Sequence, residues 1–118
     1  MNDMTKFGHI SKTKQFQMMN GGSTSISQLP DGTEIDVQAA AIVTVPETEK
    51  DPEKNILYLV GCDGVIYSTI SQTAAKSFVL AVDILGTHEL TLIKKSGKSK
   101  NGRVYIDLDV AGGNYDDE

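Results

Sequence analysis

Five positive side chains close together near the C-terminal end of the chain are its most distinctive chemical feature. They are Lys94, Lys95, Lys98, Lys100 and Arg103, and no acidic residue interrupts them. Cations at this density pair with phosphates and release the counterions that surround a nucleic acid. The net charge of the chain is −5, so this segment carries +5 and all other residues together carry −10. The cluster therefore predicts either a phosphate-binding finger on an acidic protein or a hairpin that lysines keep soluble.

Tyrosines supply the second kind of group that single-stranded nucleic acids need, because each base stacked on an aromatic ring contributes about 1–3 kcal/mol. Tyr58, Tyr67 and Tyr105 lie in strand-like segments whose aliphatic residues alternate on the opposite side. We therefore expect their rings to face outward, and Tyr105 is two residues from Arg103. The alternative is that these tyrosines simply favour half-buried strand positions.

Residues that could catalyse a reaction are sparse. His9 and His88 are isolated from other metal ligands. Cys62 has no basic neighbour to activate its thiol, and as the single cysteine it cannot form an internal disulfide. Gly97-Lys98-Ser99 lacks the upstream glycine of a phosphate-binding Walker loop. We therefore expect no enzyme, no metal and no cofactor.

The elements that would position the basic and aromatic groups are mainly strands. Lys12–Met19 alternates loosely and is the candidate first strand. Residues 35–45 predict one long strand with its aliphatic side chains on one face. Residues 56–70 predict a hairpin turned on Asp63-Gly64, in which Cys62 pairs with Val65. Two more strands, at residues 90–92 and 103–110, flank the basic turn.

One helix is expected between the tyrosine-containing hairpin and the basic hairpin. Ser71 is a suitable N-cap, and apolar residues recur at helical spacing as far as Leu85. Gly86 is placed to end the helix in a left-handed cap. The order β-β-β-α-β-β is that of a five-stranded OB-like barrel, and an open α+β antiparallel sheet is the alternative.

The expected organisation is a single β-rich domain with short ends outside it. Residues 1–11 show no periodicity and are expected to form a flexible N-terminus, followed by a nucleic-acid-binding domain over residues 12–111. Residues 112–118 are glycine-hinged and acidic, and are expected to form a flexible tail. No apolar run is long enough to cross a bilayer, so we expect no membrane partner.

Several stretches, taken in order, resemble the single-stranded DNA-binding proteins of small protein-primed phages of the phi29 type. They are Asn20-Gly21-Gly22, residues 29–33 (LPDGT), residues 63–71 (DGVIYSTIS) and residues 100–105 (KNGRVY). The resemblance implies a non-specific protein that coats and protects the DNA strand displaced during phage replication, in the cytoplasm of the infected bacterium. It also implies DNA contacts at Tyr67 and along Lys98–Tyr105.

Two points stay open at this stage. The acidic tail departs from the phi29-type pattern, and it is either a docking segment for the phage DNA polymerase or host factors, or a solubilising end. The acidity of the remaining chain also keeps a second hypothesis, a small phage interaction protein that mimics DNA and blocks a host defence factor. The oligomeric state is not predicted.

Overall fold

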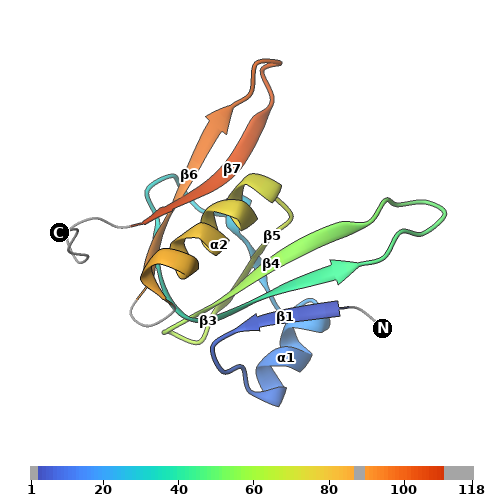
Figure 1. Cartoon of the computed structure of the whole chain (residues 1–118), viewed down its shortest axis with the longest axis vertical. Coiled ribbons are helices and arrows are strands. Elements are labelled where there is room, and N and C mark those ends of the chain that lie inside the picture. The colour runs from blue at the N-terminus through green and yellow to red at the C-terminus, as the bar shows by residue number, and fades with distance from the viewer. Residues whose placement is uncertain (1–2, 87–89, 111–118) are drawn as a thin grey trace.

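The long strand β3 (Glu34–Val45) is the centre of a mixed, curled sheet, seen in Figure 1. The computed structural model describes residues 3–86 and 90–110. The other strands are β1 (Asp3–Phe7), β2 (Thr24–Ser25), β4 (Lys54–Gly61), β5 (Ile66–Thr69), β6 (Leu90–Lys98) and β7 (Val104–Val110). The helices are α1 (Lys12–Met19) and α2 (Gln72–Leu85), with a short 3-10 turn, η1 (Ile26–Gln28), between β2 and β3.

The strands follow the order β2-β5-β4-β3-β6-β7, and every pair is antiparallel except β2 with β5. One edge of β3 is shared, because residues 34–37 pair with β6 and residues 40–44 pair with β1. The expectation of a mainly β fold is confirmed. The predicted count of five strands and one helix is wrong, since the described residues form seven strands and two α-helices.

A β-bulge divides β3 into two halves that bury opposite faces. Val37 pairs with Gly61 but Ala39 already pairs with Val60, so Gln38 is an extra residue in this strand. An extra residue reverses the side-chain alternation, because strand side chains alternate with a period of two. Val37 therefore packs in the core under α2, whereas Ala39 packs in the core beside α1. The prediction that residues 35–45 share one face is wrong for this reason.

The sheet consequently has a hydrophobic core on each side. On one side Phe78 of α2 is fully buried, and its ring meets that of Phe7 edge-on at 5.2 Å between centroids. On the other side Met18 of α1 is 1 % exposed and packs with Ile10 and the small residues of β3. Strand β4 is therefore buried on both faces. Leu59 packs in the core under α2, and its neighbours Tyr58 and Val60 pack in the core beside α1.

The N-terminal region differs from the sequence-based expectation. Asp3–Phe7 forms β1, so the predicted flexible N-terminus is wrong over these residues, and the folded domain extends further toward the start of the chain than residue 12. Lys12–Met19 is helix α1 and the predicted strand there is wrong. The Ser11 hydroxyl caps this helix by accepting from the Lys14 N–H at 3.2 Å. Met18 is the single buried residue of α1, so the sequence of this helix lacks the repeated apolar positions from which a helix is predicted.

The hairpin at Asp63-Gly64 is confirmed, but its predicted register is wrong by one residue. The Gly61 N–H donates to the Val65 carbonyl at 2.8 Å, so three residues rather than two form the loop. Gly64 ends that loop at φ +87°, a conformation that L side chains rarely adopt. Below the turn, Leu59 rather than Val60 lies opposite Tyr67.

Helix α2 is confirmed, together with both of its predicted ends. The Ser71 hydroxyl accepts from the Ala74 N–H at 3.1 Å and donates to the Ile106 carbonyl of β7, which fixes the helix start against the sheet edge. Gly86 ends the helix where expected, but the predicted left-handed cap is wrong, because its φ of +80° is combined with an extended ψ of 178°. In the described part of the chain, no helix is long and apolar enough to span a membrane.

Candidate nucleic-acid interface

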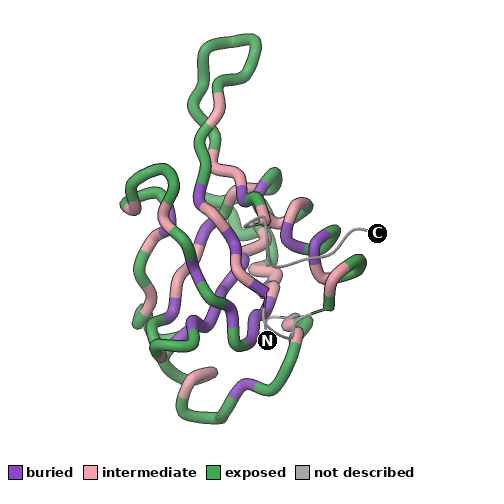
Figure 2. Tube along the Cα trace, turned by 90° about the vertical axis from the view of Figure 1, so that its left-hand side faces the viewer, coloured by how far each residue is buried: buried purple, intermediate pink, exposed green. Residues whose placement is uncertain are grey.

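The basic tip, defined here as Lys98, Lys100 and Arg103, stands at the end of a hairpin that projects from the body of the molecule (Figure 1). The turn closes where the Ser99 N–H donates to the Arg103 carbonyl at 2.8 Å. All three cations are exposed, and the tip is green at the top of Figure 2. Within residues 3–86 and 90–110, no acidic side chain forms an ion pair with them. These charges are therefore available to phosphates.

Lys94 serves the fold instead. It is 5 % exposed, and its Nζ lies 2.6 Å from Oδ1 of Asp31 and 3.1 Å from the hydroxyl of Ser96. The Gly32 N–H also donates to the Lys94 carbonyl at 2.8 Å. The lysine and serine hydrogen bonds hold the pKa of Asp31 below its usual value. Lys94 thus fastens the turn around Pro30 to β6, and its charge is already partnered.

Lys95 is also partnered, although it is about half exposed. Its ammonium group is paired with the carboxylate of Asp109 on the neighbouring strand β7. The pair raises the pKa of Lys95 and lowers that of Asp109, chiefly through the hydrogen bond between them. An exposed pair of this kind contributes little stability, so Lys95 can exchange its partner for a phosphate more easily than Lys94.

Tyr105 lies on β7 directly opposite Gly97 of β6. A Cβ atom added to Gly97 would lie 2.5 Å from Cζ and Oη of Tyr105, so the ring rests on the glycine backbone. The glycine therefore gives the ring a flat seat across the two strands. Tyr105 is 39 % exposed, and strand alternation places Arg103 on the same face.

The other two predicted tyrosines have different surroundings. Tyr58 is 7 % exposed and packs in the core beside α1, so the prediction that its ring faces outward is wrong. Burial raises its pKa. Tyr67 is half-buried, and its pKa is raised by burial first and then by the nearby Asp63 carboxylate. Tyr67 borders a small cavity of about 120 Å³ that Asp63 shares with Glu34 and Asp36, which is an unfavourable place for a phosphate.

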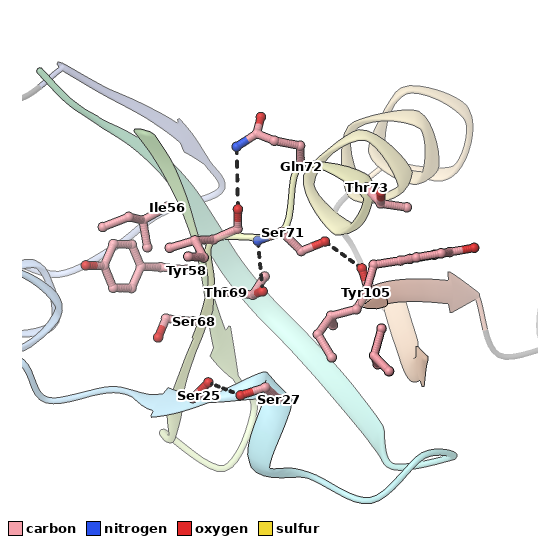
Figure 3. A pocket seen from close by; sticks show the side chains of 13 residues that line it. Ser25, Ser27, Ile56, Tyr58, Ser68, Thr69, Ser71, Gln72, Thr73 and Tyr105 are labelled. Atoms are coloured by element: carbon pink, nitrogen blue, oxygen red, sulfur yellow. Dashed lines mark hydrogen bonds between the residues drawn. The ribbon is translucent and has the colours of Figure 1, made fainter. Parts of the chain in front are cut away.

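A groove of about 650 Å³ begins where β7 leaves the basic tip. Figure 3 shows it from close by, between the start of α2, strands β4, β5 and β7, and the segment containing Ser25 and Ser27. Its apolar wall includes Tyr105 and two of the more exposed hydrophobic residues of the molecule, Ile70 at 64 % and Val104 at 65 %. Exposed apolar side chains that gather in a groove are typical of a binding surface.

The rest of the groove lining is rich in hydroxyl groups, which sequence reasoning missed. The residues concerned are Ser25, Ser27, Ser68, Thr69, Ser71 and Thr73, with Gln72 at the rim (Figure 3). Ser71 already uses its hydroxyl at the helix cap and on Ile106, and the hydroxyls of Ser25 and Ser27 bond each other. The remaining donor and acceptor capacity of these groups carries no charge, so it suits base edges and sugars of any sequence. The signal that could have drawn attention to them is the run from Ser68 to Thr73, in which an apolar residue, Ile70, stands among polar ones without either strand or helix periodicity.

Two hairpins of opposite charge project from the body of the molecule (Figure 1). The loop between β3 and β4, residues 46–53, holds Glu47, Glu49, Asp51 and Glu53 against one lysine, Lys50. It extends to the right in Figure 1, well away from the basic tip. An anionic chain is repelled by this loop and attracted by the tip, so the field favours the β7 end of the groove, next to the tip.

The described residues give little support to a metal site or to a reactive cysteine or histidine. They contain no group of three or more His, Cys, Asp or Glu side chains able to hold a metal ion. Cys62 is a free, exposed thiol in the β4–β5 loop, and His9 is exposed. His88 and the acidic tail, residues 112–118, lie outside the described residues.

Comparison with known proteins finds relatives of a single kind. The protein is 33 % identical over 103 residues to the single-stranded DNA-binding protein of Bacillus phage phi29, and the match covers 83 % of each chain. The single-stranded DNA-binding protein of Bacillus phage PZA gives the same identity and coverage. No solved structure matches the chain.

A family description covers nearly the whole sequence as well. The family described as phage single-stranded DNA-binding protein matches residues 5–111, which include the basic tip and every element of the groove. The resemblance seen in the separate sequence stretches is therefore confirmed along the domain. This chain belongs to the family of phi29-type phage single-stranded DNA-binding proteins.

Proposed function

We propose that the chain binds single-stranded DNA along the groove, with phosphates at the basic tip and a base on the ring of Tyr105. The observation that carries this proposal is that three features meet where β7 begins. They are the basic tip, which forms no ion pair with the described residues, the exposed Tyr105 and the hydroxyl-lined groove. Non-specific single-strand binders combine these same ingredients. The proposal contains no catalytic step, metal or cofactor.

The proposed contacts are narrower than those expected from the sequence. Lys94 is left out because its side chain is buried and its charge is already paired. Tyr58 lines the groove but is only 7 % exposed, so it is left out as a stacking platform. Lys95 joins the interface when a phosphate replaces Asp109 as its partner. We place Tyr67 at the margin, since the carboxylates around it repel the DNA backbone.

The groove also explains a preference for single strands. Its hydroxyl and apolar lining can reach a base only when the base is unpaired, because a duplex keeps its base faces stacked inside. We further propose that the curled sheet is an OB-like barrel, the fold that holds single strands in many proteins. The bulge in β3 supports this, because bulges bend strands at barrel corners.

The proposed role is to coat and protect the strand displaced during phage DNA replication, inside the infected bacterium. The relatives named single-stranded DNA-binding protein come from phages, which supports this setting. The DNA-mimic hypothesis gains no support from them. For the acidic tail we keep the proposal of a docking segment for the polymerase or a host factor.

The experiment that tests the proposal is an oligonucleotide titration followed by tyrosine fluorescence. We expect oligo-dT to quench the signal and duplex DNA of equal length to bind more weakly. Tyr105→Ala should weaken binding about fivefold to a hundredfold, since one stacked base contributes about 1–3 kcal/mol. Tyr105→Phe should retain most of the affinity because the ring remains.

The basic tip has a matched control on the opposite hairpin. Lys98→Ala, Lys100→Ala and Arg103→Ala should each weaken binding, whereas Lys50→Ala, which removes an exposed lysine from the acidic loop, should not. If the Lys50 variant weakens binding as much as the tip variants, the cations act through net charge alone. In that case the proposed interface is wrong even though the protein binds DNA.

A further inference from the structure

Helix α2 presents an exposed apolar face that the groove does not use. Val79 is 42 % exposed, Leu80 60 % and Ile84 72 %, and all three lie on the side of α2 away from the buried Phe78. These side chains lie in the middle and last turns of the helix, whereas the groove involves Gln72 and Thr73 at its start. An apolar cluster of this size on one helix is typical of a contact with another protein surface.

Two opposite charges frame this face. Lys76 precedes Val79 and Leu80, and Asp83 follows them. The two charged residues are seven positions apart, which is two helical turns, so they point in nearly the same direction. Both are exposed, and neither takes part in an ion pair among the residues that the structure covers.

We propose that α2 pairs in antiparallel orientation with α2 of a second copy of this chain. A two-fold axis midway between Lys76 and Asp83 places each Lys76 beside the Asp83 of the other copy and brings the two Leu80 side chains together. A two-fold interface must be self-complementary in this way, since the same patch serves both partners. The charges of this face are self-complementary, because a pair between Lys76 of one copy and Asp83 of the other forms at each end of the interface.

The surface beside α2 has room for the partner's side chains. One hollow of about 370 Å³ lies between Val79 of α2, Ile42 of β3 and Asn55 of β4. A second hollow, of about 240 Å³, lies on the other flank of the helix, where Ile84 borders Leu92 and Val110. Apolar side chains of a second α2 can enter both hollows without disturbing the core.

The expected pairing is weak in free solution. One helix face is smaller than the roughly 800 Å² per partner that stable complexes bury. Copies bound to the same DNA strand have a high effective concentration, so the pairing becomes populated there. This last step rests on the proposed function, whereas the pairing itself does not.

The test is sedimentation of the full chain without DNA, from micromolar to millimolar protein. We expect association that rises with concentration, and Lys76→Asp and Asp83→Lys each to weaken it about tenfold, because each change replaces two attractive pairs by two repulsive ones. The double variant K76D/D83K should restore association to within about threefold, since it exchanges the charges without changing the pattern. Leu80→Glu should abolish association.

A matched control is Phe16→Ser, which removes an apolar side chain of similar exposure, 67 %, from α1; it should leave association unchanged. Circular dichroism confirms that each variant is folded. The proposal is overturned if the full chain stays monomeric at millimolar concentration, or if the double variant is no better than the single ones.

Two other occupants of this face have outcomes of their own. Association that increases when residues 111–118 are removed would show that the chain's own tail covers the face. Weaker binding of Leu80→Glu to an oligonucleotide that holds one copy would assign the face to DNA. The first result supports the pairing and makes the tail its competitor, whereas the second overturns the pairing. The first does not depend on whether the groove binds DNA.

Discussion

Gly97 and Tyr105 form the most finely adjusted contact of the proposed interface. The aromatic ring covers a glycine on the opposite strand, and there is no space between them for a methyl group. Gly97 does not adopt a positive φ, so its backbone could accept another residue. Its lack of a side chain is therefore required by the ring rather than by the strand.

We predict that Gly97→Ala lifts the ring of Tyr105 from its seat and weakens binding to oligo-dT several-fold, because the base loses its aligned partner. Fluorescence titration measures the loss. The same substitution in a Tyr105→Ala background should have little further effect, as expected when two residues act through one contact. An additive double variant would show that Gly97 acts independently of the ring.

Two lysines four residues apart should separate stability from binding. Lys94→Ala removes a buried stem and its hydrogen bonds to Asp31 and Ser96, so the free energy of unfolding should fall by about 1–2 kcal/mol while the folded protein binds DNA almost normally. Lys98→Ala should leave the free energy of unfolding nearly unchanged and weaken DNA binding. Urea unfolding and DNA titration of both variants check this, and a large loss of affinity in folded Lys94→Ala would contradict it.

The ion pairs of Asp31 and Asp109 predict a loss of stability in acid. Each carboxyl has a pKa in the folded chain below its usual value of about 4, so each stabilises the fold above that pH. This stabilisation should disappear as the pH falls through the lowered pKa, where the carboxylates become protonated. Urea unfolding at a series of pH values measures it, and Asp31→Asn should flatten the curve below pH 4 while leaving the Asp109 contribution.

At the scale of single elements, the bulge at Gln38 decides which face of the sheet each half of β3 covers. The first half closes the core under α2 and the second half closes the core beside α1. A single residue thus lets one strand serve two cores and lets two different strands, β6 and β1, share its edge.

Deleting Gln38 should remove the bulge but leave each side chain on its present core. Without it, Val37 and Ala39 become consecutive opposite Gly61 and Val60, and regular alternation still turns them to opposite faces. What is lost is the bend that the bulge gives to β3, so thermal unfolding followed by circular dichroism should stay cooperative with a lower midpoint. Deleting Glu49, in the exposed loop between β3 and β4, is the matched control and should leave the transition close to that of the full chain. A Gln38 deletion without a cooperative transition would show that the bend itself is required for folding.

Local signals in the sequence explain which elements could be predicted. Ser71 and Gly86 bound α2 and Asp63-Gly64 marks a hairpin, because caps and turns depend on a few neighbouring residues. β1 could not be found, since a five-residue strand is stabilised by pairing with a distant segment. The direction of Tyr58 was unreadable as well, because β4 is buried on both faces and lacks an apolar–polar alternation.

In the candidate site, too, the features that depend on neighbouring residues could be predicted and those that depend on distant residues could not. The basic tip and Tyr105 could be predicted as one unit because they are consecutive along a hairpin. Which lysines form ion pairs with other described residues could not be predicted, since the partner of Lys94 comes from a turn far away in the sequence. The hydroxyl-lined groove joins segments from β2 to β7, and only folding brings them together.

At the scale of the whole molecule, charge is divided between two hairpins rather than spread over the surface. The chain has a net charge of −5, yet its basic tip has no ion-pair partner in the described part of the chain. Binding should accordingly depend on a few local contacts and be sensitive to salt.

We predict that the logarithm of the affinity falls with the logarithm of salt concentration at a slope of about −2, because three phosphate contacts on a single strand contribute about 0.7 each. Titrations of oligo-dT at several salt concentrations give the slope. Each tip substitution should reduce its size by about 0.7, and Lys50→Ala should leave it unchanged. A slope near zero would exclude phosphate pairing at the tip.

Strand β1 has a consequence for how the chain can be divided. It forms a ladder with β3, places Phe7 against Phe78, and is followed by Gly8 at φ +84°, where the backbone turns away. A chain that starts at residue 9 leaves the edge of Ala40–Thr44 open for a strand supplied in trans. The protein is thus naturally suited to fragment complementation, in which a short synthetic peptide restores the fold and reports, through a dye at its end, when the domain assembles.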